Sequence, residues 1–253
     1  MSNFNIKMID NLSLHDFDTE ADLIPLLTPE DEEEMTKEEL PNSIPILPLR
    51  NTVLFPGVVI PITAGRDKSI KLINDANAAG KIIGVVSQKN EEVEDPGKND
   101  IHYIGTVAKI LRVLKMPDGN VTVILQGKKR FEISKMISET PYFNALIKEV
   151  PEKRPGVNDT EFTAIIDSIK EIAIEIIKES PNIPTEATFA IKNIESKSFL
   201  INFVSSNMNL NVKEKQELLS MNILKERALA TLRFMNVELQ KLELRNDIQS
   251  KVR

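Results

Sequence analysis

The feature that most constrains this chain is a group of prolines set among apolar residues at positions 44–62. Proline has no backbone N–H, so within a sheet it is confined to edge strands, strand starts or bulges. This segment therefore cannot be a plain central strand. We predict two short strands, about 44–50 and 58–62, joined by a fixed turn at Phe55, Pro56 and Gly57.

Composition excludes several classes of site. The chain has 253 residues, enough for one large domain or two small ones. It contains no cysteine, which excludes disulfides, thiolate metal sites and a cysteine nucleophile and suits a reducing compartment. The two histidines, His15 and His102, show no metal-ligand spacing, so we expect no zinc site.

The net charge of −6 is unevenly distributed. Residues 1–43 hold 12 acidic residues and two lysines, whereas the remainder is mildly basic. Acidic blocks such as residues 30–34 usually stay solvated, and we expect residues 1–43 to be a disordered extension. No apolar run reaches membrane-spanning length, and the N-terminus lacks the features of a signal or transit peptide. We therefore expect a cytoplasmic protein that does not contact a membrane.

Glycine and proline usage changes along the chain. All nine glycines lie between Gly57 and Gly156, and the last proline is Pro184. The signals before this change favour strands and those after it favour helices. We predict a β-rich domain at 44–150, a linker at 151–157 and a helical subdomain at 158–253.

The predicted β-rich domain combines one helix with several short strands. The helix spans about 66–79, with Ile70, Ile73, Ala76 and Asn77 on its inner face and a glycine after its end. The predicted strands are 82–87, 107–116, 121–126, 127–137 and 142–150. This pattern is typical of a small, partly closed barrel.

Apolar residues after position 158 follow helical spacing. One predicted helix covers 162–177, a second about 195–207, and a third begins near 212 and continues to the last residue. The last helix keeps a 3-4-3 seam of apolar residues over 232–242. No capping residue, glycine or proline ends it, so we expect a chain that is cut rather than finished.

Motifs that carry chemistry are missing. No Gly-Lys pair is followed by Ser or Thr in a phosphate-binding loop, and there is no Gly-x-Ser-x-Gly or His-Glu-x-x-His. We predict that the chain is not an enzyme and needs no cofactor. A basic run at 128–130 beside Phe131 leaves an RNA-binding barrel as an alternative, although the scarcity of aromatic residues argues against nucleic acid as a partner.

Several sequence segments together resemble one known family. The run Pro-Ile-Leu-Pro-Leu-Arg-Asn at 45–51, continued by Phe-Pro-Gly at 55–57, resembles the opening of the N-terminal region of Lon, the ATP-dependent protease. Weaker similarities to that region follow in the same order at 65–69, 105–110, 117–119, 127–131 and 211–219.

This resemblance implies an α+β fold: a β-rich pseudo-barrel of the PUA-like type with one helix, then a helical bundle ending in a long helix from about 212. It also implies a non-catalytic module for substrate recognition and assembly, whose partners are unfolded or tagged proteins. In the family an ATPase module using ATP and magnesium and a protease domain with a Ser–Lys dyad follow, and the whole protein is a hexamer. The piece itself is then expected to be a monomer or a weak dimer.

A receptor for unfolded chains needs exposed apolar surface. Candidate substrate-binding residues are Leu54, Phe55 and Pro56 at the first turn, although such residues more often belong to a core. The long helix could be a strut between modules. A stand-alone Lon-type domain that binds a ligand or partner remains the alternative function.

Overall fold

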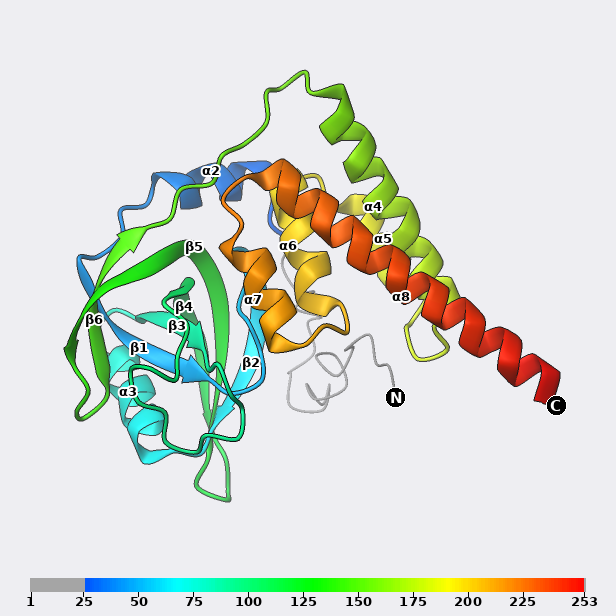
Figure 1. The fold of residues 1–253 in the computed structure, drawn as a ribbon. Coiled ribbons are helices and arrows are strands. Elements are labelled where there is room, and N and C mark those ends of the chain that lie inside the picture. The colour runs from blue at the N-terminus through cyan, green and yellow to red at the C-terminus, as the bar shows by residue number, and fades with distance from the viewer. Residues whose placement is uncertain (1–25, 253) are drawn as a thin grey trace, which may run out of the picture. The chain divides into compact units, whose positions relative to one another are not determined.

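The computed structural model describes residues 26–252, which form two compact units (Figure 1). The strand-rich unit consists of Glu30–Pro151 and Asn211–Ser220. The helical unit contains Glu152–Leu210 and the chain from Met221 onward. Strands followed by helices that end in a long one confirm the predicted α+β fold class.

Six strands form one sheet in the strand-rich unit. They are β1 (Ser43–Leu49), β2 (Val59–Ala64), β3 (Ile82–Ser87), β4 (Ile104–Lys115), β5 (Val121–Ser138) and β6 (Phe143–Glu149). All neighbouring pairs are antiparallel except β1 and β3. Helix α3 (Asp67–Ala78) makes the crossover that a parallel pair requires.

The sheet closes on itself, as the green and blue strands of Figure 1 show. Strand β6 pairs with β1 on one side and with the second half of β5 on the other, so five strands form a ring and β2 lies outside it on β5. Two register shifts interrupt the β5–β6 pairing. Such irregularities bend strands, which closure requires. The barrel core contains Ile44, Ile46, Val86, Ile101, Val107, Phe131, Ile133, Phe143, Ala145 and Ile147.

Strand β5 is longer than the sequence suggested. Residues 121–126 and 127–137, predicted as two strands, form one 18-residue strand that serves both β2 and β6. Helix α3 lies where predicted, but Leu72 and Ser69 are buried instead of Ile70 and Asn77. The observed buried face of α3 therefore shares Ile73 and Ala76 with the predicted face but is rotated about the helix axis relative to it.

Two parts of the strand-rich unit come from outside 44–150. Helix α2 (Pro29–Lys37) lies within the extension expected to be disordered, so that expectation does not hold for residues 29–37. Its residue Met35 is buried, which gives the acidic segment an anchor. Helix α7 (Val212–Ser220) also belongs to this unit, although the sequence placed it with the helical subdomain.

The helical unit is built on α4 (Thr160–Glu179) and α8 (Leu224–Val252), which contact one another. The buried face of α4 is the one predicted, and the predicted seam of α8 places Met235, Leu239 and Leu242 in the core. Helix α6 (Lys197–Asn207) agrees with prediction, and α5 (Glu186–Asn193) was missed. Because the hydrophobic stripes of α4 and α8 face inward, the unit has its own core.

The predicted helix from 212 to the end is two helices, since the chain breaks at residues 221–223. There the backbone N–H of Lys153 donates to the carbonyl of Asn222 at 2.8 Å, and Leu224 donates to the Lys153 carbonyl at 3.0 Å. Buried Arg227 donates to the Met221 carbonyl at 2.8 Å. These contacts replace helical hydrogen bonds and separate α7 from α8.

Candidate functional site

The turn proposed as a substrate contact lies mostly inside the barrel. Leu54 is 2% exposed and Phe55 is 0% exposed, whereas Pro56 is half-buried. Side chains this deeply buried cannot meet an unfolded polypeptide unless the barrel opens. The structure therefore places Leu54 and Phe55 in the core, and of the three candidates Pro56 alone keeps part of its surface accessible.

Backbone contacts explain why this turn is fixed. Thr106 donates its hydroxyl to the Leu54 carbonyl at 2.6 Å, and Gly57 donates its N–H to the Gly127 carbonyl at 2.9 Å. A Cβ atom at Gly127 would collide with the carbonyl of Phe55, so β5 approaches the turn as closely as glycine permits. The Phe-Pro-Gly motif therefore packs the turn closely against β5.

Exposed apolar side chains lie elsewhere on both units. On the strand-rich unit they are Tyr103, Leu111, Met116, Ile137 and Leu146. The helical unit exposes Val157, Phe189, Val237, Leu244 and Ile248. Single exposed apolar residues are ordinary on protein surfaces. Phe189 is more unusual, because 73% of a large aromatic residue is accessible to solvent on a short helix.

A pocket opens on the strand-rich unit beside α3. Its apolar lining comes from Ile46 of β1, Leu72 of α3, Phe143 of β6 and Pro96 of the loop that follows β3, and all four residues are buried. The pocket is small, because the centre of a water-sized sphere can occupy only about 30 Å³ within it. It is a small candidate site on the strand-rich unit. The predicted inner face of α3 omitted Leu72, so no pocket was expected here.

Arg66, at the start of α3, builds one wall of this pocket. Its guanidinium donates to the Pro48 carbonyl at 2.8 Å, to the Gln88 side-chain oxygen at 2.9 Å and to the Glu94 carbonyl at 3.3 Å. Gln88 in turn donates to the Val93 carbonyl at 2.8 Å. One arginine therefore holds β1, the end of β3 and the following loop together.

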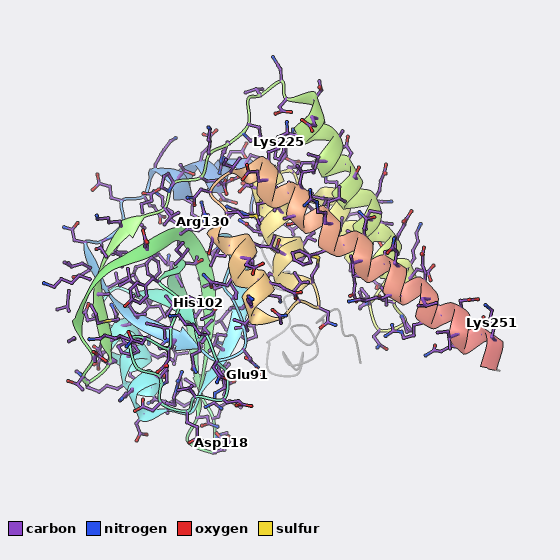
Figure 2. All side chains as sticks on the ribbon, in the orientation of Figure 1. Glu91, His102, Asp118, Arg130, Lys225 and Lys251 are labelled. Atoms are coloured by element: carbon purple, nitrogen blue, oxygen red, sulfur yellow. The ribbon has the colours of Figure 1, made fainter. Side chains whose placement is uncertain are left out.

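A buried arginine attaches α7 to the barrel. Arg130 of β5, labelled in Figure 2, donates to the carbonyl of Leu219 at 2.8 Å and to that of Pro151 at 3.1 Å. Gln216 of α7 donates to the Ile104 carbonyl at 2.9 Å. The basic run at 128–130 considered for nucleic-acid binding therefore contributes its arginine to the protein interior.

Lys128 and Lys129, the rest of that run, form ion pairs with Glu38 at 3.3 Å and with Glu149 at 3.2 Å. Their side chains are only 15% and 12% exposed. Cations that are paired and largely covered make a poor contact for a phosphate backbone. These contacts weigh against the RNA-binding alternative.

Burial is the first cause of the pKa shift of several groups, among them Lys215 and His102. Burial lowers the pKa of Lys215 on α7 from 10.5 to about 8. Burial, followed by the charge of Lys89, lowers the pKa of His102. Neither group lines the pocket beside α3. Within residues 26–252 no group of His, Asp and Glu is arranged to hold a metal ion.

The strand-rich unit thus carries a small hollow beside α3 on a closed barrel. Residues 43–237 match the family described as the ATP-dependent protease La (LON) substrate-binding domain. The chain belongs to this family. No helix among the described residues has the length and apolar character needed to cross a membrane.

Relatives and solved structures agree with this assignment. The chain is 82% identical to a Lon protease of Flavobacterium johnsoniae over all of its residues, and it covers 31% of that protein. It is 48% identical to a Lon protease of Cytophaga hutchinsonii, with 93% of this chain and 29% of that protein covered. The chain thus spans about a third of the length of these relatives.

Two solved N-terminal domains share the fold. That of a Mycobacterium avium complex Lon protease aligns with a TM-score of 0.59 at 21% identity, covering 77% of this chain and 98% of that one. A Lon N-terminal domain protein from Xanthomonas campestris aligns with a TM-score of 0.54 at 15% identity, covering 76% and 97%.

Proposed function

We propose that this chain binds segments of unfolded or tagged polypeptides for a Lon-type protease and performs no chemistry itself. The observation that carries this proposal is the match of residues 43–237 to the substrate-binding domain family. The physical features fit the role, because a binding module needs a rigid scaffold with accessible apolar groups. The barrel supplies the scaffold, and the exposed side chains of Tyr103, Leu111, Met116, Ile137 and Leu146 supply accessible apolar groups.

We propose further that the parent protein is a cytoplasmic hexamer that joins this module to an ATPase and to a serine protease with a Ser–Lys dyad. ATP and magnesium would act in the ATPase and not in this chain. The support for this step is the similarity to Lon proteases that are about three times longer than this chain. Detection of the native product in source cells tests it. A product of 28.5 kDa would favour the stand-alone alternative.

The binding proposal is tested with one polypeptide in two states. Fluorescein-labelled α-lactalbumin, reduced and carboxamidomethylated so that it stays unfolded, is titrated with the chain while its anisotropy is followed. Native α-lactalbumin, with the same sequence, is the control. We expect binding to the unfolded form only. Equal binding of both forms, or binding of neither, would refute the proposal.

Salt dependence distinguishes the proposal from the RNA-binding alternative. The free energy of burying apolar surface depends little on ionic strength. The affinity of a protein for phosphates falls steeply with salt, because salt cations compete with its lysines and arginines for the phosphates. We therefore expect affinity for unfolded α-lactalbumin to change less than threefold between 50 and 500 mM KCl. An RNA oligonucleotide that binds more tightly than α-lactalbumin, with a steep salt dependence, would favour the alternative.

A further inference from the structure

Strand β2 has a neighbour on one side only. It pairs with β5, and no second strand pairs with it in the part of the chain that the structure describes. Residues 57–65, which contain this strand, carry no charged side chain and are mostly apolar or β-branched. The free edge of a strand presents N–H and C=O groups that can pair with another chain, and charged side chains are a common protection against such pairing. The edge of β2 lacks that protection.

The hydrogen bonds where β2 begins show which backbone groups point toward this free edge. Gly127 of β5 donates its N–H to the Val58 carbonyl at 2.9 Å. In an antiparallel pair, residues that bond to the partner strand alternate with residues whose N–H and C=O groups point away from it. The residues of β2 whose backbone groups point to the free edge are therefore Val59, Pro61 and Thr63.

A side-chain contact agrees with this alternation. Thr63 lies opposite Thr122 of β5, and their hydroxyl oxygens are 3.1 Å apart. Opposite residues that do not exchange backbone hydrogen bonds bring their side chains closest together, so this contact fits a Thr63 backbone that points away from β5. Thr63 is exposed and Val59 and Pro61 are half-buried, so solvent reaches the side chains along this edge.

Proline at position 61 alters the centre of the free edge. Its missing N–H costs the pairing with β5 nothing, because that group would point away from β5. Two copies of the chain could pair their β2 edges in antiparallel fashion around a two-fold axis, with the two residues at position 61 opposite one another and Val59 opposite Thr63. A residue with an N–H at position 61 would form both hydrogen bonds of the central pair. Proline forms neither, which leaves the carbonyl groups of that pair without a donor.

We propose that Pro61 prevents the free edge of β2 from pairing with β2 of a second copy of this chain. The other residues of the strand favour such pairing, because valine, isoleucine and threonine are common in strands and no charge on the edge repels a second copy. One residue therefore decides whether this surface joins two copies. The inference concerns self-association and is independent of the proposed binding of unfolded polypeptides.

Pro61→Thr tests the proposal, because threonine supplies the missing N–H and suits a strand. Position 61 faces away from β5, so the variant should keep the circular dichroism spectrum of the wild type and unfold at a similar urea concentration. Pro181→Thr is the matched control. It introduces the same N–H at an exposed turn between α4 and α5, away from any strand edge.

Sedimentation velocity over 1–100 µM protein measures self-association. We expect Pro61→Thr to associate at least tenfold more tightly than the wild type, whereas Pro181→Thr should behave like the wild type. Hydrogen–deuterium exchange locates the contact. The amides of residues 59–63 in Pro61→Thr should exchange more slowly at the highest protein concentration than at the lowest.

Adding Thr63→Lys to Pro61→Thr places a charge on the same edge and should return self-association to the wild-type level. A folded Pro61→Thr variant that associates no more tightly than the wild type would overturn the proposal. Association that leaves the exchange of residues 59–63 unchanged, or that persists with Thr63→Lys, would place the contact elsewhere and would also overturn it. A Pro61→Thr variant that fails to fold would show that the proline is needed within β2, which contradicts the geometry on which the proposal rests.

Discussion

Replacing Lys215 by methionine should stabilise the strand-rich unit. This lysine is 9% exposed on α7, and burial lowers its pKa from 10.5 to about 8. A shift of that size corresponds to roughly 3 kcal/mol of disfavoured charge at neutral pH. Methionine has a similar length and no charge, so Lys215→Met should recover much of this free energy of unfolding. The polar interactions of the ammonium group offset part of the gain, because methionine cannot make them.

The sign of the pH dependence follows from linkage. Between about pH 8 and 10.5 the unfolded state keeps the Lys215 proton while the native state has released it. Stability of the wild type therefore rises with pH in this window. From pH 7 to pH 9 the rise from this group is roughly 1 kcal/mol, and the advantage of Lys215→Met over the wild type should shrink by the same amount.

Urea unfolding followed by tyrosine fluorescence measures this effect. The chain has two tyrosines, Tyr103 and Tyr142, and both lie in the strand-rich unit. Lys213→Met, at an exposed position on the same helix, is the control and should change stability by less than about 0.5 kcal/mol. A Lys215→Met variant that is less stable than the wild type at pH 7, or a difference that stays constant to pH 9, would refute the reasoning.

Three further predictions concern contacts within each unit. Arg130→Met leaves the Leu219 and Pro151 carbonyls without their donor and should cost about 3 kcal/mol in urea unfolding, whereas a decrease below about 1 kcal/mol would contradict the role of the arginine. Gly127→Ala forces a Cβ atom against backbone and should cost about 1–3 kcal/mol; an unchanged urea midpoint would show that the turn can shift. Asp159 caps α4, and the Phe162 N–H and then Lys225 lower its pKa, so Asp159→Ala should lower Tm at neutral pH. The difference should begin to shrink as the pH falls below 3.8 and should be lost as the pH falls through the lowered pKa of the native state. A Tm difference that is as large at pH 2 as at pH 7 would argue against a contribution from the charge of Asp159.

Local sequence signals predicted much of the fold. The prolines at 44–62 do punctuate two strands and a turn, because the lack of an N–H is a property of proline in any context. The apolar spacing of α4 and of the α8 seam was also sufficient to predict each helix and its buried face, because one face of each helix is buried over several turns. Each of these features can be predicted from residues that are close together in the sequence.

The features that sequence failed to predict depend on distant partners. The break between α7 and α8 has no glycine or proline, because it is set by hydrogen bonds from Lys153 and Arg227 to the chain at 221–223. Burial of Leu54 and Phe55 depends on closure of the barrel, which no local pattern encodes. The pocket required the burial of Leu72, and that depends on where α3 packs against β1 and β3.

The placement of α7 in the strand-rich unit has a consequence for synthesis on the ribosome. All six strands are translated before α4, α5 and α6, yet Arg130 and Gln216 cannot make their contacts until α7 has followed them. The nascent barrel must therefore persist without one of its helices while the intervening helices emerge. A polypeptide released at Pro151 would expose the surface that α7 covers, and such a truncated product would be prone to aggregate.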